Sequence, residues 1–161
     1  MKKCILLLFI TMASVTLSRA QIIVAFTATT GDSEMNNILT DIHNQAIKDI
    51  TTFHNNVVNT FNIVSSKVDA ALKILAPGDV YMAAQLSISV GKPFEDVVQT
   101  YQKNKSKGWG AIAKDLGIKP GSAEFHAMKK SMKSKGGKGN GNGNAGEKGK
   151  GKGNSGKGKK K

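Results

Sequence analysis

The sequence predicts an all-α protein in which a long amphipathic helix is followed by a small four-helix domain and a disordered C-terminal tail. Apolar residues recur at steps of three and four through residues 32–76, which is typical of one face of a helix. Helix start and stop signals then recur through residues 77–130. The β-prone stretch at residues 21–31 has no partner strand, so we expect an extended leader there.

The net charge of +13 is concentrated at the two ends of the chain. Residues 1–20 hold three basic residues and no acidic one, and residues 129–161 hold twelve lysines and one glutamate. Residues 21–128 are close to neutral, because nine lysines face ten acidic residues. The 161-residue chain has room for one modest domain with appendages. The basic charge at its C-terminal end indicates an appendage that binds polyanions.

Residues 1–20 have the organisation of a secretory signal peptide. Two lysines precede an unbroken apolar run at residues 4–10, and the small-x-small pattern Ser18-Arg19-Ala20 ends the segment. The run is far shorter than the roughly 20 residues that span a bilayer, so we expect no transmembrane segment after cleavage. Cleavage would also remove Cys4, the sole cysteine. We therefore expect an exported protein, periplasmic or extracellular, without disulfides.

The helix expected over residues 32–76 carries an eleven-residue apolar repeat. A period of 3.67 residues per turn keeps such a stripe almost straight along a helix. β-branched residues and asparagines at residues 51–56 leave a bend or a hairpin as the alternative. The stripe must be covered by the C-terminal domain, by itself folded back, or by a second copy of the protein, which makes residues 35–75 a candidate homo-oligomer contact. The stripe consists of Met35, Leu39, Ile42, Ala46, Ile50, Phe53, Val57, Phe61, Val64, Val68, Ala71 and Leu75.

Four short helices are expected in residues 77–130. Pro77-Gly78-Asp79 ends one helix and caps the next, Gly91 and Pro93 mark a second boundary, and Pro120-Gly121-Ser122 starts the last helix. The side chains expected to form the core of this domain are Tyr81, Phe94, Tyr101, Trp109, Ile112, Leu116 and Phe125.

A long motif lies within these helices. Gly91-Lys-Pro-Phe-x-x-Val-Val-x-x-Tyr101 is followed by Gly108-Trp-Gly-x-Ile-Ala-Lys-x-Leu-Gly-Ile-Lys-Pro-Gly-Ser-x-Glu-Phe-His126. These residues resemble a module of small exported bacterial proteins of uncharacterised function. The resemblance covers residues 77 to about 130 and implies a compact helical fold in a bacterial envelope. It lends no catalytic residue, and the long helix and the tail lie outside it.

Catalytic and metal-binding constellations are not evident in the sequence. His43 and His54 are eleven residues apart, about 16 Å along one helix, so they cannot share a metal ion, and we expect both on the surface. No serine or cysteine is placed beside His126 by the sequence. We therefore expect no enzyme activity, no cofactor and no metal site.

The spacing of residues 113–118, followed by a turn and another helix, is that of a helix-turn-helix DNA reader. Pro120-Gly121 lengthens the turn, however, and residues 123–128 carry an acid and apolar side chains where base-reading polar groups are needed. A helix-turn-helix nucleic-acid binder is therefore the weaker alternative.

Residues 131–161 are expected to form the tail. From Lys135 onward no apolar residue is larger than alanine, so this segment cannot build a core. Lysines near the free end favour binding to an anionic polymer such as lipopolysaccharide, acidic polysaccharide or extracellular nucleic acid, because binding releases counterions. The alternative is a solubilising tail on an assembly module of the envelope. The expected binding residues are Lys148, Lys150, Lys152, Lys157, Lys159, Lys160 and Lys161, with a second anion surface at Lys103, Lys105 and Lys107.

Overall fold

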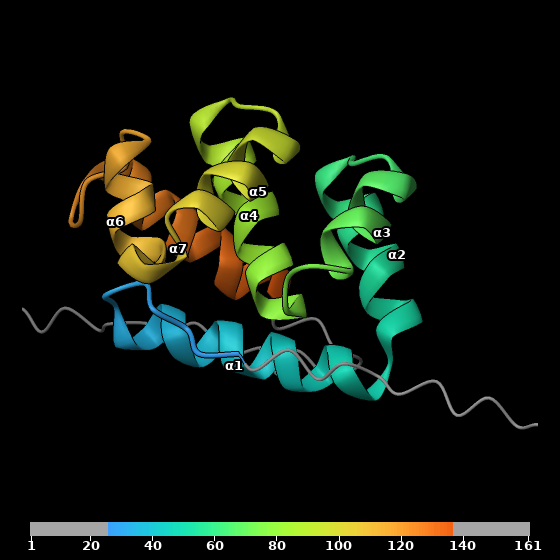
Figure 1. The fold of residues 1–161 in the computed structure, drawn as a ribbon. Helices are drawn as coiled ribbons and strands as arrows, with labels where there is room; N and C mark the ends of the chain where they lie inside the picture. The colour runs from blue at the N-terminus through green and yellow to red at the C-terminus, as the bar shows by residue number, and fades with distance from the viewer. Residues whose placement is uncertain (1–25, 137–161) are drawn as a thin grey trace, which may run out of the picture.

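The computed structural model describes residues 26–136, and every regular element in this range is a helix (Figure 1). The predicted all-α fold class is therefore confirmed. The elements are α1 (Ser33–Lys48), α2 (Ile50–Phe61), α3 (Ser65–Leu72), α4 (Pro77–Val90), α5 (Phe94–Lys103), a short 3-10 turn η1 (Lys105–Lys107), α6 (Gly108–Asp115) and α7 (Ala123–Gly136).

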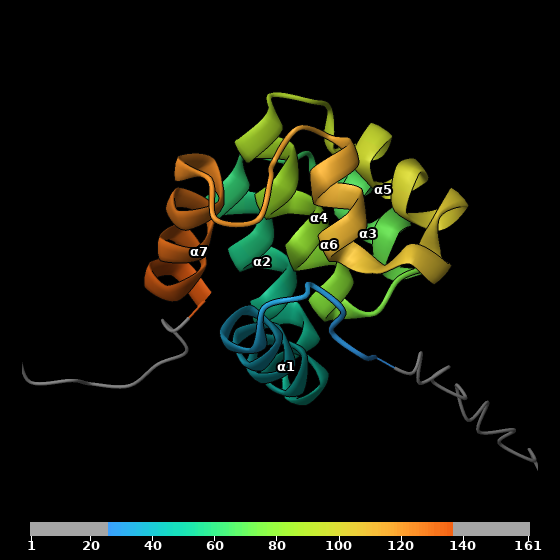
Figure 2. The same cartoon turned by 90° about the vertical axis from the view of Figure 1, so that its left-hand side faces the viewer.

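α4 is the central helix of the fold. It contacts α1, α2, α3, α5 and α7, and its residues 78–87 are buried without interruption. In Figure 2, α1 is seen nearly end-on below α4, with α7 on one side and α5 and α6 on the other. Pro77 lies in the first turn of α4, and Gly91 ends the helix with a left-handed backbone (φ 65°). The other helices therefore pack around a helix that has no polar face.

The single helix expected over residues 32–76 is wrong, because the chain changes direction twice. Asp49 leaves helical geometry (φ −146°, ψ 85°), and its carboxylate accepts hydrogen bonds from the N–H of Thr52 at 2.9 Å and from the Thr52 hydroxyl at 2.6 Å. Asn62 then ends α2 in the left-handed region (φ 51°, ψ 44°), which asparagine tolerates better than most residues. The first break lies just before residues 51–56, where the bend was expected as the alternative.

The two turns fold the apolar stripe against the rest of the protein. All but two of its side chains are at most 7% exposed. The exceptions are Ile50, at 44%, and Val64, at 60%, which lie next to the two turns. The stripe is thus covered within one chain, and it does not provide the apolar surface that the homo-oligomer hypothesis required.

One hydrophobic core joins both parts of the chain. Its members come from α1 through α7, so residue 77 marks a change between helices and not the edge of a separate core. Helix α7 also continues to Gly136, with Met132 fully buried, so the start of the tail expected at residue 131 is wrong by at least six residues. Residues 1–25 and 137–161 lie outside the described part, and the predictions for them stay predictions.

The side chains expected in the core differ in depth. Tyr81, Phe94, Tyr101, Trp109 and Ile112 are buried, whereas Leu116 and Phe125 are half-buried at the edge of the cluster. The rings of Tyr101 and Trp109 stack with centroids 4.0 Å apart. Tyr81 instead meets Phe61 of α2 edge-on at 5.2 Å, so the aromatic residues are split between two contacts.

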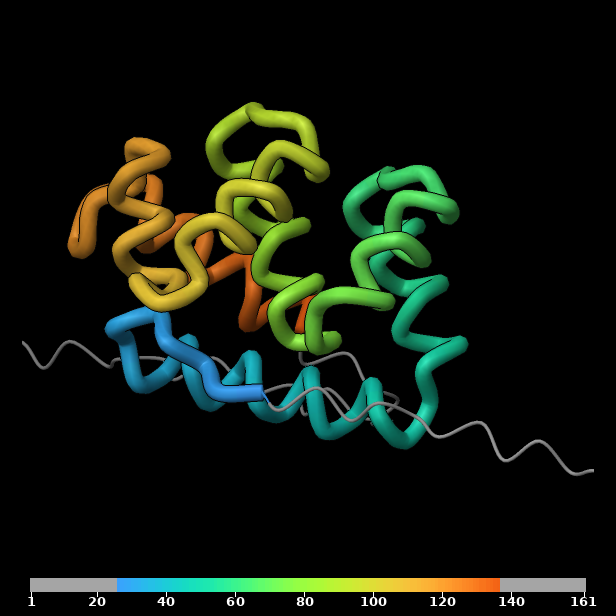
Figure 3. The backbone as a smooth tube through the Cα atoms, in the orientation of Figure 1, coloured from blue at the N-terminus to red at the C-terminus, as the bar shows by residue number. Residues whose placement is uncertain are grey.

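Residues 26–31 of the expected leader run alongside α1 in the opposite direction (Figure 3). The Gly110 N–H donates to the Thr29 carbonyl at 3.1 Å, and the Thr30 N–H donates to the Asn36 side chain at 2.9 Å. A Cβ atom on Gly110 would lie 2.4 Å from the Thr30 carbonyl oxygen, and one on Gly108 would lie 2.8 Å from that of Thr29. Because Gly108 and Gly110 have no side chains, the backbone of the leader can pack directly against the start of α6.

Candidate functional site

The structure bears on one of the two predicted anion-binding surfaces. Lys103, Lys105 and Lys107 are all exposed, on the end of α5 and on η1. Lys107 faces Asp115 at 3.7 Å, which offsets part of this charge at the surface. Lys107 and Lys114 also line a hollow of about 620 Å³ between the leader, α6 and the start of α7. The seven tail lysines, residues 148–161, lie outside the described residues.

The segment with helix-turn-helix spacing has a different geometry from that motif. Seven residues, 116–122, separate α6 from α7, whereas the motif uses a turn of about three to four residues. α7 packs against α1 and α4 through Met128 and Met132. Lys129 of this helix lies between Asp32, at 2.9 Å, and Glu34, at 2.6 Å. Part of the basic charge of α7 is therefore used to hold α1.

A buried polar cluster lies where α4, α5 and α6 meet. The Trp109 indole N–H donates to the Asp79 carboxylate at 2.7 Å, and both residues are almost fully buried. Desolvation raises the pKa of Asp79, although the Trp109 hydrogen bond opposes this shift. Burial and the nearby Asp79 carboxylate raise the pKa of Tyr101. The cluster explains why a tryptophan can occupy this position, since its polar edge meets an acceptor.

The leader closes over a buried histidine. The expectation that His43 lies on the surface is wrong: it is 9% exposed, and its ring stacks on Phe26 with centroids 4.6 Å apart. Desolvation lowers the pKa of His43, and its Nδ1 has no hydrogen-bond partner among the described residues. A Cβ atom on Gly78 would lie 2.5 Å from the Phe26 ring. His54, in contrast, is half-buried and contacts Asp69 at 3.1 Å.

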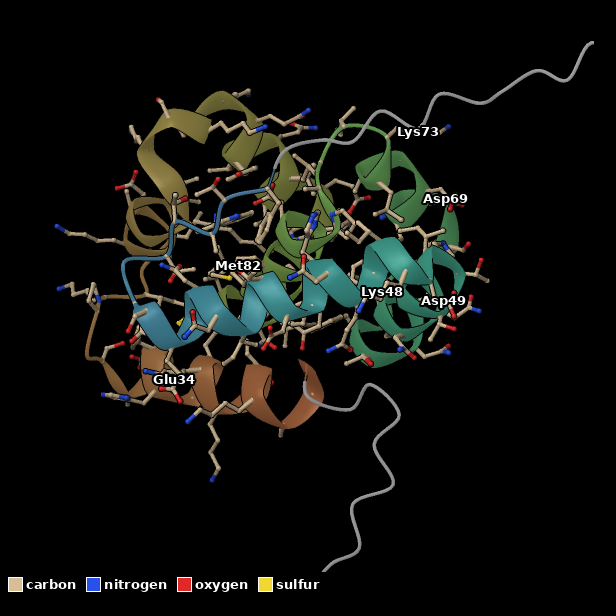
Figure 4. The ribbon with its side chains drawn as sticks, turned by 90° about the horizontal axis from the view of Figure 1, so that it is seen from below. Glu34, Lys48, Asp49, Asp69, Lys73 and Met82 are labelled. Atoms are coloured by element: carbon tan, nitrogen blue, oxygen red, sulfur yellow. The ribbon has the colours of Figure 1, made fainter. Side chains whose placement is uncertain are left out.

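A groove of about 740 Å³ runs between α1, α2 and the end of α7. Figure 4 shows Lys48 and Asp49, which lie on its rim, at the junction of α1 and α2. Tyr81 of α4 forms part of the lining, and its buried hydroxyl has no hydrogen-bond partner among the described residues. Burial raises the pKa of Tyr81 to about 12, so the phenol is neutral at pH 7. The sequence placed Tyr81 in the core, and its need for a polar partner was the one signal that could have indicated this groove.

Neither a metal site nor a membrane-spanning helix is found within residues 26–136. No three His, Cys, Asp or Glu side chains gather there as metal ligands would. None of the described helices is long and apolar enough to cross a bilayer. Comparison of the chain with protein-family models, curated proteins and solved structures finds no match.

Proposed function

We propose that this chain is an exported binding protein that engages anionic polymers through its basic C-terminal tail. The observation that carries the proposal is the division of charge. Residues 129–161 hold twelve lysines against one glutamate, while residues 21–128 are close to neutral. A segment with so little acid interspersed gains by counterion release on binding a polyanion.

Two of the lysines counted in residues 129–161 belong to α7 and are paired with acidic residues at the start of α1. Lys129 is held by Asp32 and Glu34, and Lys133 also pairs with Glu34. Figure 4 shows Glu34 on the side of α1 that faces α7. These two lysines are held by acidic residues of the folded part, so the proposal places polymer binding on the lysines from Lys148 to Lys161.

The compartment follows from the expected signal peptide at residues 1–20 and from the resemblance of residues 77–130 to a module of exported bacterial proteins. In such a setting, lipopolysaccharide, acidic polysaccharide and extracellular nucleic acid are the available polyanions. The assembly alternative required an exposed stripe at residues 35–75, and burial of that stripe removes its main support. Polyanion binding therefore takes first place.

The experiment compares the full mature chain with a variant in which the seven lysines from Lys148 to Lys161 are replaced by glutamine. Binding to a fluorescent duplex is measured by anisotropy at two salt concentrations, with two unrelated base sequences. If about six to ten lysines contact phosphates, affinity should fall by roughly 10³ to 10⁵ between about 50 and 200 mM salt, irrespective of sequence.

The seven-lysine variant should lose this binding, and a matched variant with Lys103, Lys105 and Lys107 replaced by glutamine should keep it. The reverse pattern would move the site to the α5–η1 surface and revive the helix-turn-helix alternative. Absence of binding to duplex, heparin and lipopolysaccharide at low salt would make the tail a solubility device.

A further inference from the structure

We infer that the groove between α1, α2 and α7 binds a fatty carboxylate, that is, an acyl chain with an anionic head group. The inference goes beyond the proposed function and does not depend on polyanion binding by the tail. Three properties of the groove lead to this ligand: its apolar lining, an unpartnered phenol, and the charge at its rim.

The groove has a recessed apolar floor, while more than half of its lining residues are polar or charged. Ile42, Ala46, Phe53 and Val57 all face the groove, yet each is at most 7% exposed. These side chains therefore form the floor of the groove and not a flat surface patch. An alkyl chain fits such a lining because it gains free energy for every methylene removed from water and has no polar group to satisfy.

Tyr81 adds a hydrogen-bond donor to this lining. It is 6% exposed, and its hydroxyl finds no partner among residues 26–136. The edge-on contact with Phe61 holds the ring. A buried hydroxyl without a partner is costly. The Tyr81 hydroxyl is closed to solvent, so a carboxylate reaches it when the side chains that cover it shift, and a plain hydrocarbon gains nothing from that donor. Because the phenol stays neutral up to a pKa of about 12, it can donate to a carboxylate at any ordinary pH.

The rim of the groove favours a negative head group. Lys48 and Lys135 both line it, and Lys135 lies 5.4 Å from the centre of the Phe61 ring. Asp49 is also on the rim, and its hydrogen bonds from Thr52 keep the carboxylate ionised, so the two lysines exceed the acidic charge of the rim by one. Helix α7 ends at Gly136, which itself borders the groove.

The test uses the full mature chain and laurate below its micelle concentration. Methyl NMR should show saturable shifts for Ile42 and Val57, which line the groove, and none for Val97, which is buried in α5. Dodecyltrimethylammonium has the same chain length and the opposite charge, and it should bind at least about tenfold more weakly. Equal binding of the two, or no saturable shift with laurate, would overturn the inference.

Three variants locate the site. Asn56→Trp places a bulky ring on the rim from an exposed position, and it should abolish the laurate shifts. Asn55→Trp is the matched control, since Asn55 is exposed on the same helix and does not line the groove. Tyr81→Phe keeps the ring and removes the donor, so affinity should fall about tenfold. Equal laurate binding by both tryptophan variants would place the ligand elsewhere.

The seven-lysine tail variant separates this inference from the proposed function. It should lose duplex binding and still show laurate shifts at Ile42 and Val57. If it keeps the laurate shifts while the unmodified chain binds no polyanion, the proposed function fails and the groove stands. Loss of the laurate shifts in this variant would mean that the tail, and not the groove, held the carboxylate.

Discussion

The first three helices and the last four contribute to one core in different ways. α1, α2 and α3 are amphipathic, with a buried apolar stripe on one face and exposed, largely polar residues opposite. α4 has no polar face, since residues 78–87 are buried in succession. Three buried polar residues of α4 are hydrogen-bonded, Asp79 to Trp109, Gln85 to Ser131 and Ser87 to the Ala84 carbonyl, whereas the Tyr81 hydroxyl has no partner among the described residues.

This difference indicates which helices mainly supply buried apolar area and which contacts fix the position of one helix against another. An apolar stripe constrains the register of a helix less than a buried hydrogen bond does, so α1–α3 supply mainly burial, and surface ion pairs such as Lys129 with Glu34 add to their positioning. A buried hydrogen bond tolerates no such shift, because sliding α4 by one residue would leave Asp79 and Gln85 without partners. We therefore expect changes around α4 to cost more than equally buried changes in the stripe.

The largest loss of stability is expected for Trp109→Ala. This substitution removes a fully buried side chain and leaves the Asp79 carboxylate without its donor, for a loss of about 5 kcal/mol. Urea unfolding followed by circular dichroism measures it. The control, Trp109→Phe, keeps an aromatic ring against Tyr101 and loses the hydrogen bond. A loss below about 1 kcal/mol for this control would show that the hydrogen bond does not fix α4.

The second largest loss is expected for Val57→Asp in the stripe. Val57 is 1% exposed, and a carboxyl group there costs about 3 kcal/mol even if it becomes protonated. Sedimentation should show the same mass as for the unsubstituted protein, because the stripe lies inside the chain. A change of mass instead would restore the oligomer hypothesis.

Val64→Asp is the matched control, because Val64 belongs to the same stripe and is 60% exposed. It is the N-cap of α3 and makes no side-chain capping bond. Aspartate at this position should accept a hydrogen bond from the backbone and stabilise the protein by about 0.5 to 1 kcal/mol. Two valines of one apolar pattern are thus expected to respond with opposite signs.

A loss of stability of about 2 kcal/mol is expected for Gly110→Ala, which tests the contact between α6 and the leader at residues 26–31. The added methyl group would lie 2.4 Å from the Thr30 carbonyl oxygen, so the leader must move away from α6. Hydrogen exchange of the Gly110 position should rise, because its N–H donates to Thr29. If the N–H at position 110 instead kept its protection from hydrogen exchange, the close approach of Gly110 to Thr30 would not be what holds the leader against α6.

The helices of residues 77–130 could be predicted because local signals mark their ends. Gly91, Pro93 and the Pro120-Gly121 turn act within a few residues, and the end of α4, the start of α5 and the start of α7 lie near these positions. In residues 32–76 a bend was only the alternative to one helix, and the second break was not expected, because the stripe keeps its period on each side of a turn. Asp49 followed by Thr52 at the third position is a capping signal that could have located the first break.

The candidate sites could not be predicted to the same extent. The groove joins Ile42, Tyr81 and Lys135, which are distant in the sequence and share no periodic pattern. His43 was expected at the surface because nothing local indicates that Phe26 covers it. The tail lysines could be proposed from composition alone, since their binding depends on charge and not on a folded geometry.

The smallest loss of stability is expected for Asp49→Ala, which removes the cap that separates α1 from α2. The hydrogen bonds from Thr52 lower the pKa of Asp49 below its usual 3.8. The cap therefore contributes stability above the pKa of the unfolded chain, and this contribution is lost as the pH falls through the lower pKa of the folded protein.

Urea unfolding at neutral pH should thus show a lower midpoint for Asp49→Ala, and the difference should shrink at a pH well below 3.8. Asp49→Asn keeps an acceptor oxygen that does not titrate in this range, so it should preserve most of the stability at both pH values. An Asp49→Ala protein with an unchanged midpoint would mean that the packing of the stripe around α4, and not the cap, sets the break between α1 and α2.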